Sequence, residues 1–386
     1  MLNLRKVGTM FIDIYAIQSV PPSNINRDDT GAPKTALYGG VRRARVSSQA
    51  WKRATREEFP KYLPEESLGI RTKFAAELLA QKIVEFDAGL KERAAELASA
   101  VLGALGIKVE TSKRAGDDEG KNETKYLIFF GRGELDALAH IAVSWTEEGK
   151  NLKKLDRAAK EEAKSAFKGA KAVDIALFGR MLADVPELNT DASCQVAHAI
   201  SVDRVTQEFD YFTAIDDCAS GDNAGASMID TVDYNSSTLY RYANINVDAL
   251  REQLADVHAT ACGVKAFLEA FVRSMPTGKQ NSFANRTLPN CVLVSLREEQ
   301  PFNAVSAYES PVSAGKDGSI SHIAAKRLGE CVAQYEKEYD MKAQKAWYVS
   351  VDGPIESLDS IAEKVTLAGL VEGVNSEVEA AFGTGE

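Results

Sequence analysis

Cysteine is scarce in this chain and follows no pattern. The sequence holds five cysteines among 386 residues, at positions 194, 218, 262, 291 and 331. Their number is odd and no two form a C-x-x-C pair, which argues against a disulfide framework and against a zinc ribbon. A reducing compartment suits such a chain best, so we expect a cytoplasmic protein.

Long apolar runs are also lacking. No stretch approaches the roughly 18 apolar residues of a membrane helix. Residues 1–18 have neither the apolar core nor the cleavage site of a signal peptide. We therefore expect no membrane partner. The length suits one large domain with insertions or two domains, and an apolar fraction of 45% is enough for a sizeable core.

Positive charge is in deficit overall. The net charge of −10 argues against nucleic-acid binding by the surface as a whole, because phosphate is attracted by local positive potential. A basic groove on an otherwise acidic protein remains compatible with this composition. The useful question is therefore where lysine and arginine are concentrated.

Recognisable catalytic motifs are missing. The four histidines are scattered, and His198 could be a lone core histidine. No serine or cysteine lies in a nucleophile motif, and Gly39-Gly40 and residues 131–133 are too short for a nucleotide-binding loop. We predict a binding protein with no catalytic residue, no metal and no cofactor. The alternative is Mg²⁺ held by Asp28 and Asp29, although adjacent carboxylates in loops more often cap turns.

One basic segment stands out at 42–56. It carries six basic residues and no acid: Arg42, Arg43, Arg45, Lys52, Arg53 and Arg56. Ser47, Ser48 and Gln49 lie where a helix should begin, and unpaired amides at a helix start attract phosphate. The segment is therefore a candidate backbone-phosphate site. A capped helix with a solvated basic face is the alternative.

A second basic stretch spans 150–168. The spacing predicts a helix over 151–168 whose basic residues share one face: Lys150, Lys153, Arg157, Lys160, Lys164 and Lys168. Every amphipathic helix has a polar side, so a solvated surface is the simpler interpretation. A face that is nearly all one sign also suits contact with nucleic acid.

The remaining pattern predicts an α+β protein rather than a doubly wound sheet. Strands are expected near 9–17, 126–130, 172–181, 239–247, 291–296 and 346–351, and helices over 71–105, 134–145, 249–274, 320–338 and near the C-terminus. Residues 111–125 predict a mobile loop. Residues 199–236 predict a long projecting hairpin, on which Tyr211, Phe212 and Thr213 could contact bases or pack on a neighbouring protein.

Several unusual blocks occur together in one order. They are NRDD (26–29), RRARVSSQAWKRA (42–54), DIALFGRM (174–181), VAHAIS (196–201), DYFTAIDD (210–217) and LYRYANIN (239–246), with a looser PTGKQNSFA (276–284). In these blocks, over about two-thirds of its length, the chain resembles the CasC family. That family is the RNA-binding backbone subunit of the type I-E CRISPR complex called Cascade.

The resemblance implies a right-hand shape. Its RRM-like or ferredoxin-like palm would comprise residues 1–59, 172–198 and 239–386, with helical fingers at 60–171 and a β-hairpin thumb at 199–238. Copies would stack head to tail along the spacer of a crRNA and hold it open for target DNA. Heterologous contacts of this kind build open helical assemblies. Other partners would be the large subunit, the small subunit and the subunits that bind the crRNA ends.

The resemblance also implies site residues. RNA contacts would fall on Arg27, Lys34, Ser47, Gln49, Lys52 and Arg53, with Lys279 and Gln280 in the looser block. Arg180, Met181 and Phe212 would lie near a displaced nucleotide, and duplex DNA would meet Lys150, Lys153, Lys154, Arg157 and Lys160. Related backbone subunits cut RNA, so a metal-dependent endoribonuclease that uses Asp28 or Asp29 is the rival function.

Overall fold

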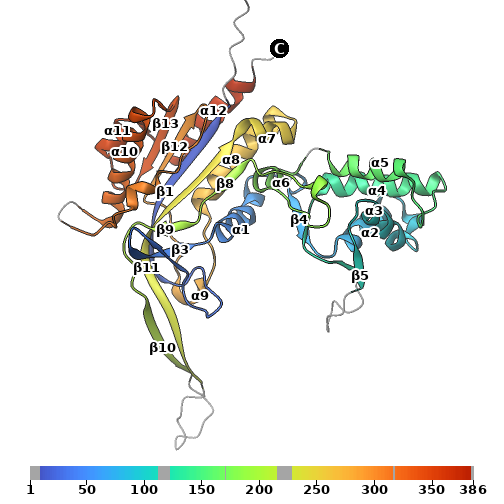
Figure 1. The fold of residues 1–386 in the computed structure, drawn as a ribbon, viewed down its shortest axis with the longest axis horizontal. Coiled ribbons are helices and arrows are strands. Elements are labelled where there is room, and N and C mark those ends of the chain that lie inside the picture. The colour runs from blue at the N-terminus through green and yellow to red at the C-terminus, as the bar shows by residue number, and fades with distance from the viewer. Residues whose placement is uncertain (1–8, 112–121, 170, 215–227, 316–317, 384–386) are drawn as a thin grey trace, which may run out of the picture. The chain divides into compact units, whose positions relative to one another are not determined.

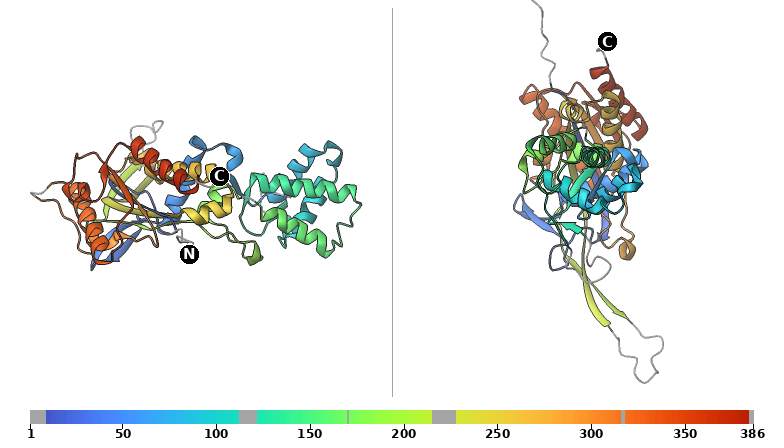
Figure 2. Two further views of the ribbon diagram at one scale, coloured as in Figure 1. Left: turned by 90° about the horizontal axis from the view of Figure 1, so that it is seen from above. Right: turned by 90° about the vertical axis from the view of Figure 1, so that its right-hand side faces the viewer.

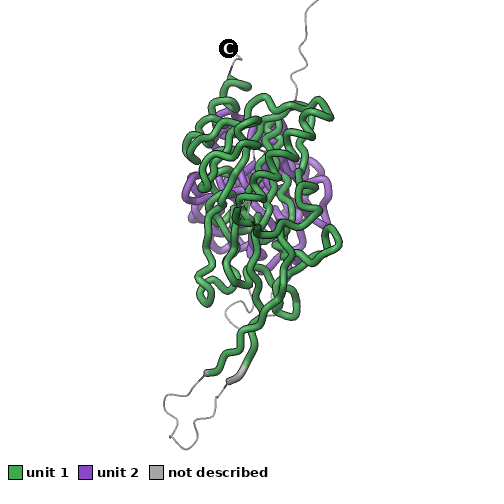
Figure 3. The backbone as a smooth tube through the Cα atoms, turned by 90° about the vertical axis from the view of Figure 1, so that its left-hand side faces the viewer, with its two compact units in different colours: residues 1–58, 195–247, 264–386 green, residues 59–194, 248–263 purple. Residues whose placement is uncertain are grey.

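The computed structural model describes residues 9–111, 122–169, 171–214, 228–315 and 318–383. They form a mixed α/β fold that divides into two compact units (Figure 3). Unit 1 consists of residues 1–58, 195–247 and 264–386, and unit 2 of residues 59–194 and 248–263. The predicted hairpin tip and most of the predicted mobile loop lie outside the described residues. The boundaries assigned to palm, fingers and thumb stay predictions.

Unit 1 is built on one large sheet (Figure 1). Its strand order is β14-β13-β12-β1-β11-β9-β3-β2, with β8 and β10 paired to β11. β1 pairs antiparallel with β11 and β12, as do β10 and β9 with β11, β12 with β13, and β3 with β2 and β9, whereas β13 and β14 are parallel. The strands are β1 (Phe11–Ser23), β2 (Thr35–Tyr38), β3 (Val41–Val46), β8 (Cys194–Val196), β9 (Ala199–Ser201), β10 (Glu208–Ala214), β11 (Met228–Asn246), β12 (Cys291–Arg297), β13 (Lys345–Ser350) and β14 (Glu363–Lys364).

Helices cover both faces of this sheet. Tyr15 and Ile17 of β1 pack with α10 on one face, while Arg241 of β11 meets α1 and α8 on the other. Because both faces are covered, the central strand β1 is buried from Ile12 to Gln18. The helices that contribute to unit 1 are α1 (Ser48–Glu58), α8 (Val257–Arg273), α9 (Gln280–Phe283), η6 (Ala304–Tyr308), α10 (Ile320–Glu338), α11 (Glu356–Asp359) and α12 (Leu367–Phe382).

The predicted projecting hairpin is present in the described strands. β11 is 19 residues long; one end pairs with β1 in the sheet and the other, residues 228–234, pairs with β10. Figure 2 shows this two-stranded arm extending beyond the rest of the sheet. A two-stranded ribbon has little core of its own, so its side chains are left for contact with a partner.

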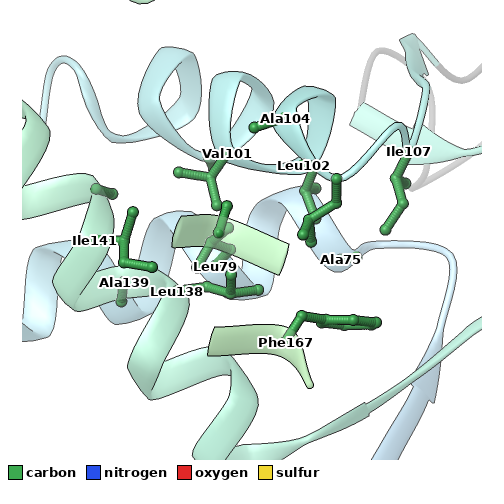
Figure 4. Packing of buried hydrophobic residues seen from close by; sticks show 14 of the residues in the cluster. Ala75, Leu79, Val101, Leu102, Ala104, Ile107, Leu138, Ala139, Ile141 and Phe167 are labelled. Carbon is green, nitrogen blue, oxygen red and sulfur yellow. The ribbon is translucent and has the colours of Figure 1, made fainter. Parts of the chain in front are cut away.

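Unit 2 is mainly helical and has a separate core (Figure 4). Leu79 of α2, Leu102 of α3, Leu138 of α4 and Phe167 of α5 are all fully buried in one cluster. Its elements are η1 (Phe59–Lys61), η2 (Glu65–Ser67), β4 (Gly69–Thr72), α2 (Ala75–Phe86), η3 (Ala88–Leu90), α3 (Ala94–Ala104), β5 (Val109–Thr111), β6 (Asn122–Thr124), β7 (Ile128–Gly131), α4 (Arg132–Glu147), α5 (Arg157–Phe167), α6 (Val173–Phe178), η4 (Pro186–Leu188) and α7 (Val247–Leu254).

Some predicted elements are confirmed and others are wrong. The helix over 320–338 is confirmed as α10. The strand predicted at 172–181 is wrong, because this short apolar run forms the buried helix α6, and periodicity alone cannot distinguish the two. The single helix predicted over 249–274 is two helices, α7 and α8, separated at Ala255, whose φ is 55°. Within the described ranges, no helix is long and apolar enough to span a membrane.

Candidate nucleic-acid interface

The start of α1 is held by the loop that precedes β2. Asn26 Oδ1 accepts a hydrogen bond from the Ser47 amide at 2.8 Å. Ser47 in turn caps the helix, because its Oγ accepts from the Ala50 amide at 3.3 Å. The predicted helix start is therefore confirmed, with a buried Ser47 as cap and with Ser48 and the exposed Gln49 in the first turn. The positive end of the helix dipole lies here, where an anion is favoured.

The basic residues of α1 lie away from its buried face. Trp51, Ala54 and Thr55 are buried, whereas Lys52 and Arg56 are half-buried and Arg53 is exposed. Arg53 Nε donates to Glu57 Oε1 at 2.7 Å, and this bond raises the pKa of Arg53. An exposed pair of this kind is weak, so a phosphate can compete for the guanidinium.

Residues 276–284 are brought against the same loop. A Cβ on Gly278 would lie 2.4 Å from the Ile25 carbonyl oxygen, so only glycine permits this approach. Lys279, whose φ is 51°, and Gln280 follow directly and are half-buried. Lys279 and Gln280 are thereby placed near the loop that holds the start of α1.

The three arginines of β3 have different roles. Arg42 is exposed, and Arg45 is half-buried at the end of the strand. Arg43 is fully buried, and its guanidinium donates to five carbonyl oxygens at 2.7–3.3 Å, those of Tyr38, Ser201, Val202, Tyr308 and Glu309. The prediction that Arg43 contacts RNA is wrong for this structure, because all its donors are used to join β3, β9 and η6.

His198 is a member of the site that the sequence did not identify. It is exposed between β8 and β9 rather than buried in the core, and its Nδ1 lies 3.1 Å from Arg45 Nη1. Partial burial and the nearby charges of Arg45 and Lys34 hold the pKa of His198 below its usual value. Lys34 is itself tied to β3, because its carbonyl oxygen accepts from the Arg45 amide at 2.9 Å.

The hairpin presents aromatic side chains on both faces. Successive residues of a strand point to opposite sides, so Phe209 and Tyr211 share one face and Phe212 lies on the other. Their exposed fractions are 65%, 63% and 37%. Near its base, Tyr234 of β11 packs against Phe283 of α9 with ring centroids 5.9 Å apart. Phe212 is therefore available to a partner, and its neighbours Phe209 and Tyr211 are more exposed still.

The two adjacent carboxylates of the loop have no metal-like arrangement. Asp28 Oδ1 accepts from the Thr30 amide at 2.9 Å, the Thr30 hydroxyl at 2.7 Å and the Ala32 amide at 3.1 Å. These bonds lower the pKa of Asp28, so it closes its own turn. Asp29 is exposed. Among the described residues, no group of three His, Cys, Asp or Glu side chains could hold a metal ion.

Arg180 and Met181 belong to unit 2 and differ in exposure. Arg180 Nη1 donates to Glu134 Oε2 at 2.6 Å and to the Phe129 carbonyl at 3.0 Å, and the group is 5% exposed. A direct RNA contact by Arg180 is therefore contradicted, because its charge is compensated inside unit 2. Met181 is 79% exposed and remains available.

The basic stretch of unit 2 is not one helical face. Asp156 caps α5 by accepting from the Ala159 amide at 2.8 Å, so the helix begins at Arg157 and Lys153 and Lys154 precede it. The helix predicted from 151 is wrong in this respect. Lys150 is half-buried, 3.0 Å from Glu148 and 3.4 Å from Glu162. Lys153, Lys154, Arg157 and Lys160 are exposed.

In unit 1 these features place a capped helix start beside a loop and a strand that carry cations. The chain belongs to the CT1975-like protein family, whose family model matches residues 12–373. A search of curated proteins found no match.

Two solved structures are similar over nearly the whole chain. A chain of a "CRISPR RNA-guided surveillance complex, pre-nicking" is 32% identical, with a TM-score of 0.80 over 96% of this chain and 100% of that chain. A chain of another "CRISPR RNA-guided surveillance complex" is 29% identical, with a TM-score of 0.69 over 95% of this chain and 99% of that chain.

Proposed function

We propose that this chain is a non-catalytic, RNA-binding backbone subunit of a type I-E CRISPR surveillance complex. This proposal rests on one region of unit 1 that brings together the capped start of α1, the loop bearing Arg27 and Lys34, the half-buried Arg45 of β3, and residues 279–280. The family membership and the two similar structures support the same function.

The residue types in this region suit a guide-holding protein. Lysine, arginine, serine, glutamine and helix-start amides bind phosphate and sugar, which carry no sequence information. Such a protein must leave base identity to pairing between guide RNA and target DNA. Copies would stack head to tail on the crRNA, next to the large subunit, the small subunit and the crRNA-end-binding subunits.

We assign the parts of a right hand on the same basis. The sheet of unit 1 would be an RRM-like palm, the helical unit 2 would be the fingers, and the β10–β11 hairpin would be the thumb. Phe212 on the thumb would press on a base or sugar, where stacking contributes about 1–3 kcal/mol per base. The exposed Lys153 and Lys154 would meet duplex DNA.

The test of RNA binding replaces Lys52 and Arg53 by alanine. RNA affinity should fall about equally for unrelated sequences, and the dependence of log Kd on log salt should become shallower, because fewer counterions are released. Fluorescence anisotropy over a salt series measures both. The control replaces Lys337 and Lys342, which are exposed elsewhere on unit 1, and so makes the same change in net charge. A loss that depends on RNA sequence, or an equal loss in the control, contradicts the proposal.

The non-catalytic part of the proposal needs its own measurement. The assembled complex is incubated with complementary RNA and Mg²⁺, and the RNA is resolved on a denaturing gel. The proposal expects intact RNA, because Asp28 is used within its own turn. Regularly spaced cuts that disappear in Asp28→Ala or Asp29→Ala would establish the nuclease instead.

A further inference from the structure

Two nitrogen-bearing side chains of unit 1 meet without a compensating acid, and a third, that of Lys34, acts on the pKa of His198. His198 lies between β8 and β9, Arg45 ends β3, and Lys34 precedes β2. The Arg45 Nη1 to His198 Nδ1 distance is 3.1 Å. In the described part of the chain, Lys34 and Arg45 are the charged groups that act on the pKa of His198, and both are cations. No described carboxylate forms an ion pair with any of the three.

The contact with Arg45 fixes the form of the imidazole. A guanidinium has only donors, so His198 Nδ1 must accept and cannot carry a proton. The ring is then neutral with its proton on Nε2. Protonation at Nδ1 would require the Arg45 N–H to turn away. In the absence of an anion, this leaves two cations beside a histidine that is held neutral.

The surroundings of the cluster indicate which anion would complete it. Lys34 and Arg45 line a small concavity together with Ser23 at the end of β1, Asn26 of the loop, and Asn235 and Ser237 of β11. Apolar side chains such as Val20, Ile25 and Leu239 complete the lining. Asn26 also holds the Ser47 amide at the start of α1. The cluster is therefore connected through Asn26 to the start of α1, and a phosphodiester of the RNA backbone matches the positive charge and the hydrogen-bond donors of Lys34 and Arg45.

We propose that His198 is a phosphate contact of the bound RNA and takes up one proton from solvent when the RNA binds. The Arg45 N–H to Nδ1 bond breaks, and both side chains then donate to phosphate oxygens. This inference rests on the proposed function, because the anion is supplied by RNA.

The sign of the pH dependence follows from linkage. In the free protein, partial burial and the neighbouring cations hold the pKa of His198 below its usual value, and a phosphate anion raises it. Since the bound state then holds more protons than the free state, RNA affinity is enhanced below the bound pKa and is lost as pH rises through it. For one proton, Kd changes by at most about tenfold per pH unit.

The test measures binding of oligo(U) carrying a pH-insensitive cyanine label, between about pH 6 and 8 at constant ionic strength. Neither phosphodiester nor uracil titrates in this range. The wild type should bind more tightly as pH falls. His198→Gln, which keeps a neutral donor, should retain binding at the upper pH and lose most of the pH dependence. His322→Gln, at a half-exposed position in α10, is the matched control and should behave as the wild type.

A second readout counts the proton directly. Titration calorimetry in two buffers of different ionisation enthalpy should show net proton uptake for the wild type near the midpoint of the pH profile, and less for His198→Gln. An unchanged pH profile and unchanged proton uptake in His198→Gln would overturn this inference alone. Failure of the wild type to bind oligo(U) at any pH would overturn the proposed function as well.

Discussion

Replacement of Arg43 by methionine tests whether this arginine stabilises the fold or binds RNA. The change keeps most of the volume of the side-chain stem but removes every donor from a site with 0% exposure. Four carbonyl oxygens within 3.2 Å of the guanidinium lose this donor, those of Ser201, Val202, Tyr308 and Glu309. The Val202 oxygen still accepts from the Val312 amide at 2.8 Å. These carbonyls belong to segments that are distant in the sequence. Removing the guanidinium therefore weakens the contact of β3 with β9 and η6.

The magnitude follows from the number of acceptors left behind. A buried acceptor without a donor costs about 1–3 kcal/mol, and such costs do not add fully because neighbours relax. We expect Arg43→Met to lower the free energy of unfolding of unit 1 by about 3–5 kcal/mol. Arg42→Met is the matched control. Arg42 is exposed, so its removal should change stability by less than about 0.5 kcal/mol.

The assay must report on unit 1 alone. Of the three tryptophans, Trp51 and Trp347 lie in unit 1 and Trp145 lies in unit 2. Urea unfolding followed by tryptophan fluorescence in a Trp145→Phe background therefore isolates unit 1. RNA affinity should fall in Arg42→Met and stay near wild type in folded Arg43→Met. If Arg43→Met has normal stability but selectively loses RNA affinity, the structural role assigned to Arg43 is refuted.

Two further predictions concern unit 2. Glu134→Ala should destabilise unit 2 by about 3–5 kcal/mol, because Glu134 is buried and lies 2.6 Å from Arg180 and 2.8 Å from Lys171. Trp145 fluorescence during urea unfolding measures this change. An unchanged unfolding midpoint would mean that other groups compensate the two cations. Replacing both Lys153 and Lys154 by glutamate should leave assembly of the protein on RNA intact and slow the capture of duplex DNA in stopped-flow association. Loss of assembly on RNA would instead show that these lysines contact RNA or another subunit.

Local signals in the sequence predicted several parts of the site correctly. The serine pair before Trp51 marks a helix start, and the structure places the cap on Ser47. The polar run after Ile215, between alternating stretches, predicted a hairpin, and β10 and β11 form its arms. Asp156 is the cap of α5, and an aspartate before a helical pattern is a helix-start signal already present in the sequence.

Other features depend on contacts that no local pattern contains. Arg42 and Arg43 are adjacent and chemically identical, yet one is exposed and the other is fully buried. The difference arises because the Tyr308 and Glu309 carbonyls, more than 260 positions away, close over Arg43. Arg180 is buried for a similar reason, since Glu134 reaches it from α4. Tertiary packing, rather than charge spacing, decides which basic residues remain available.

The acidic balance of the chain bears on how RNA would be positioned. With a net charge of −10, the average surface repels phosphate, and attraction is limited to places where cations lack acidic partners. Screening at physiological salt acts over about 8 Å, so the repulsion and the attraction both remain local. On unit 1, RNA would then be held in the region of α1, Lys34 and Arg45, while the exposed Lys153 and Lys154 of unit 2 would attract duplex DNA. Such a protein should bind RNA with few phosphate contacts per copy, and a long strand would be held firmly only when several copies engage it together.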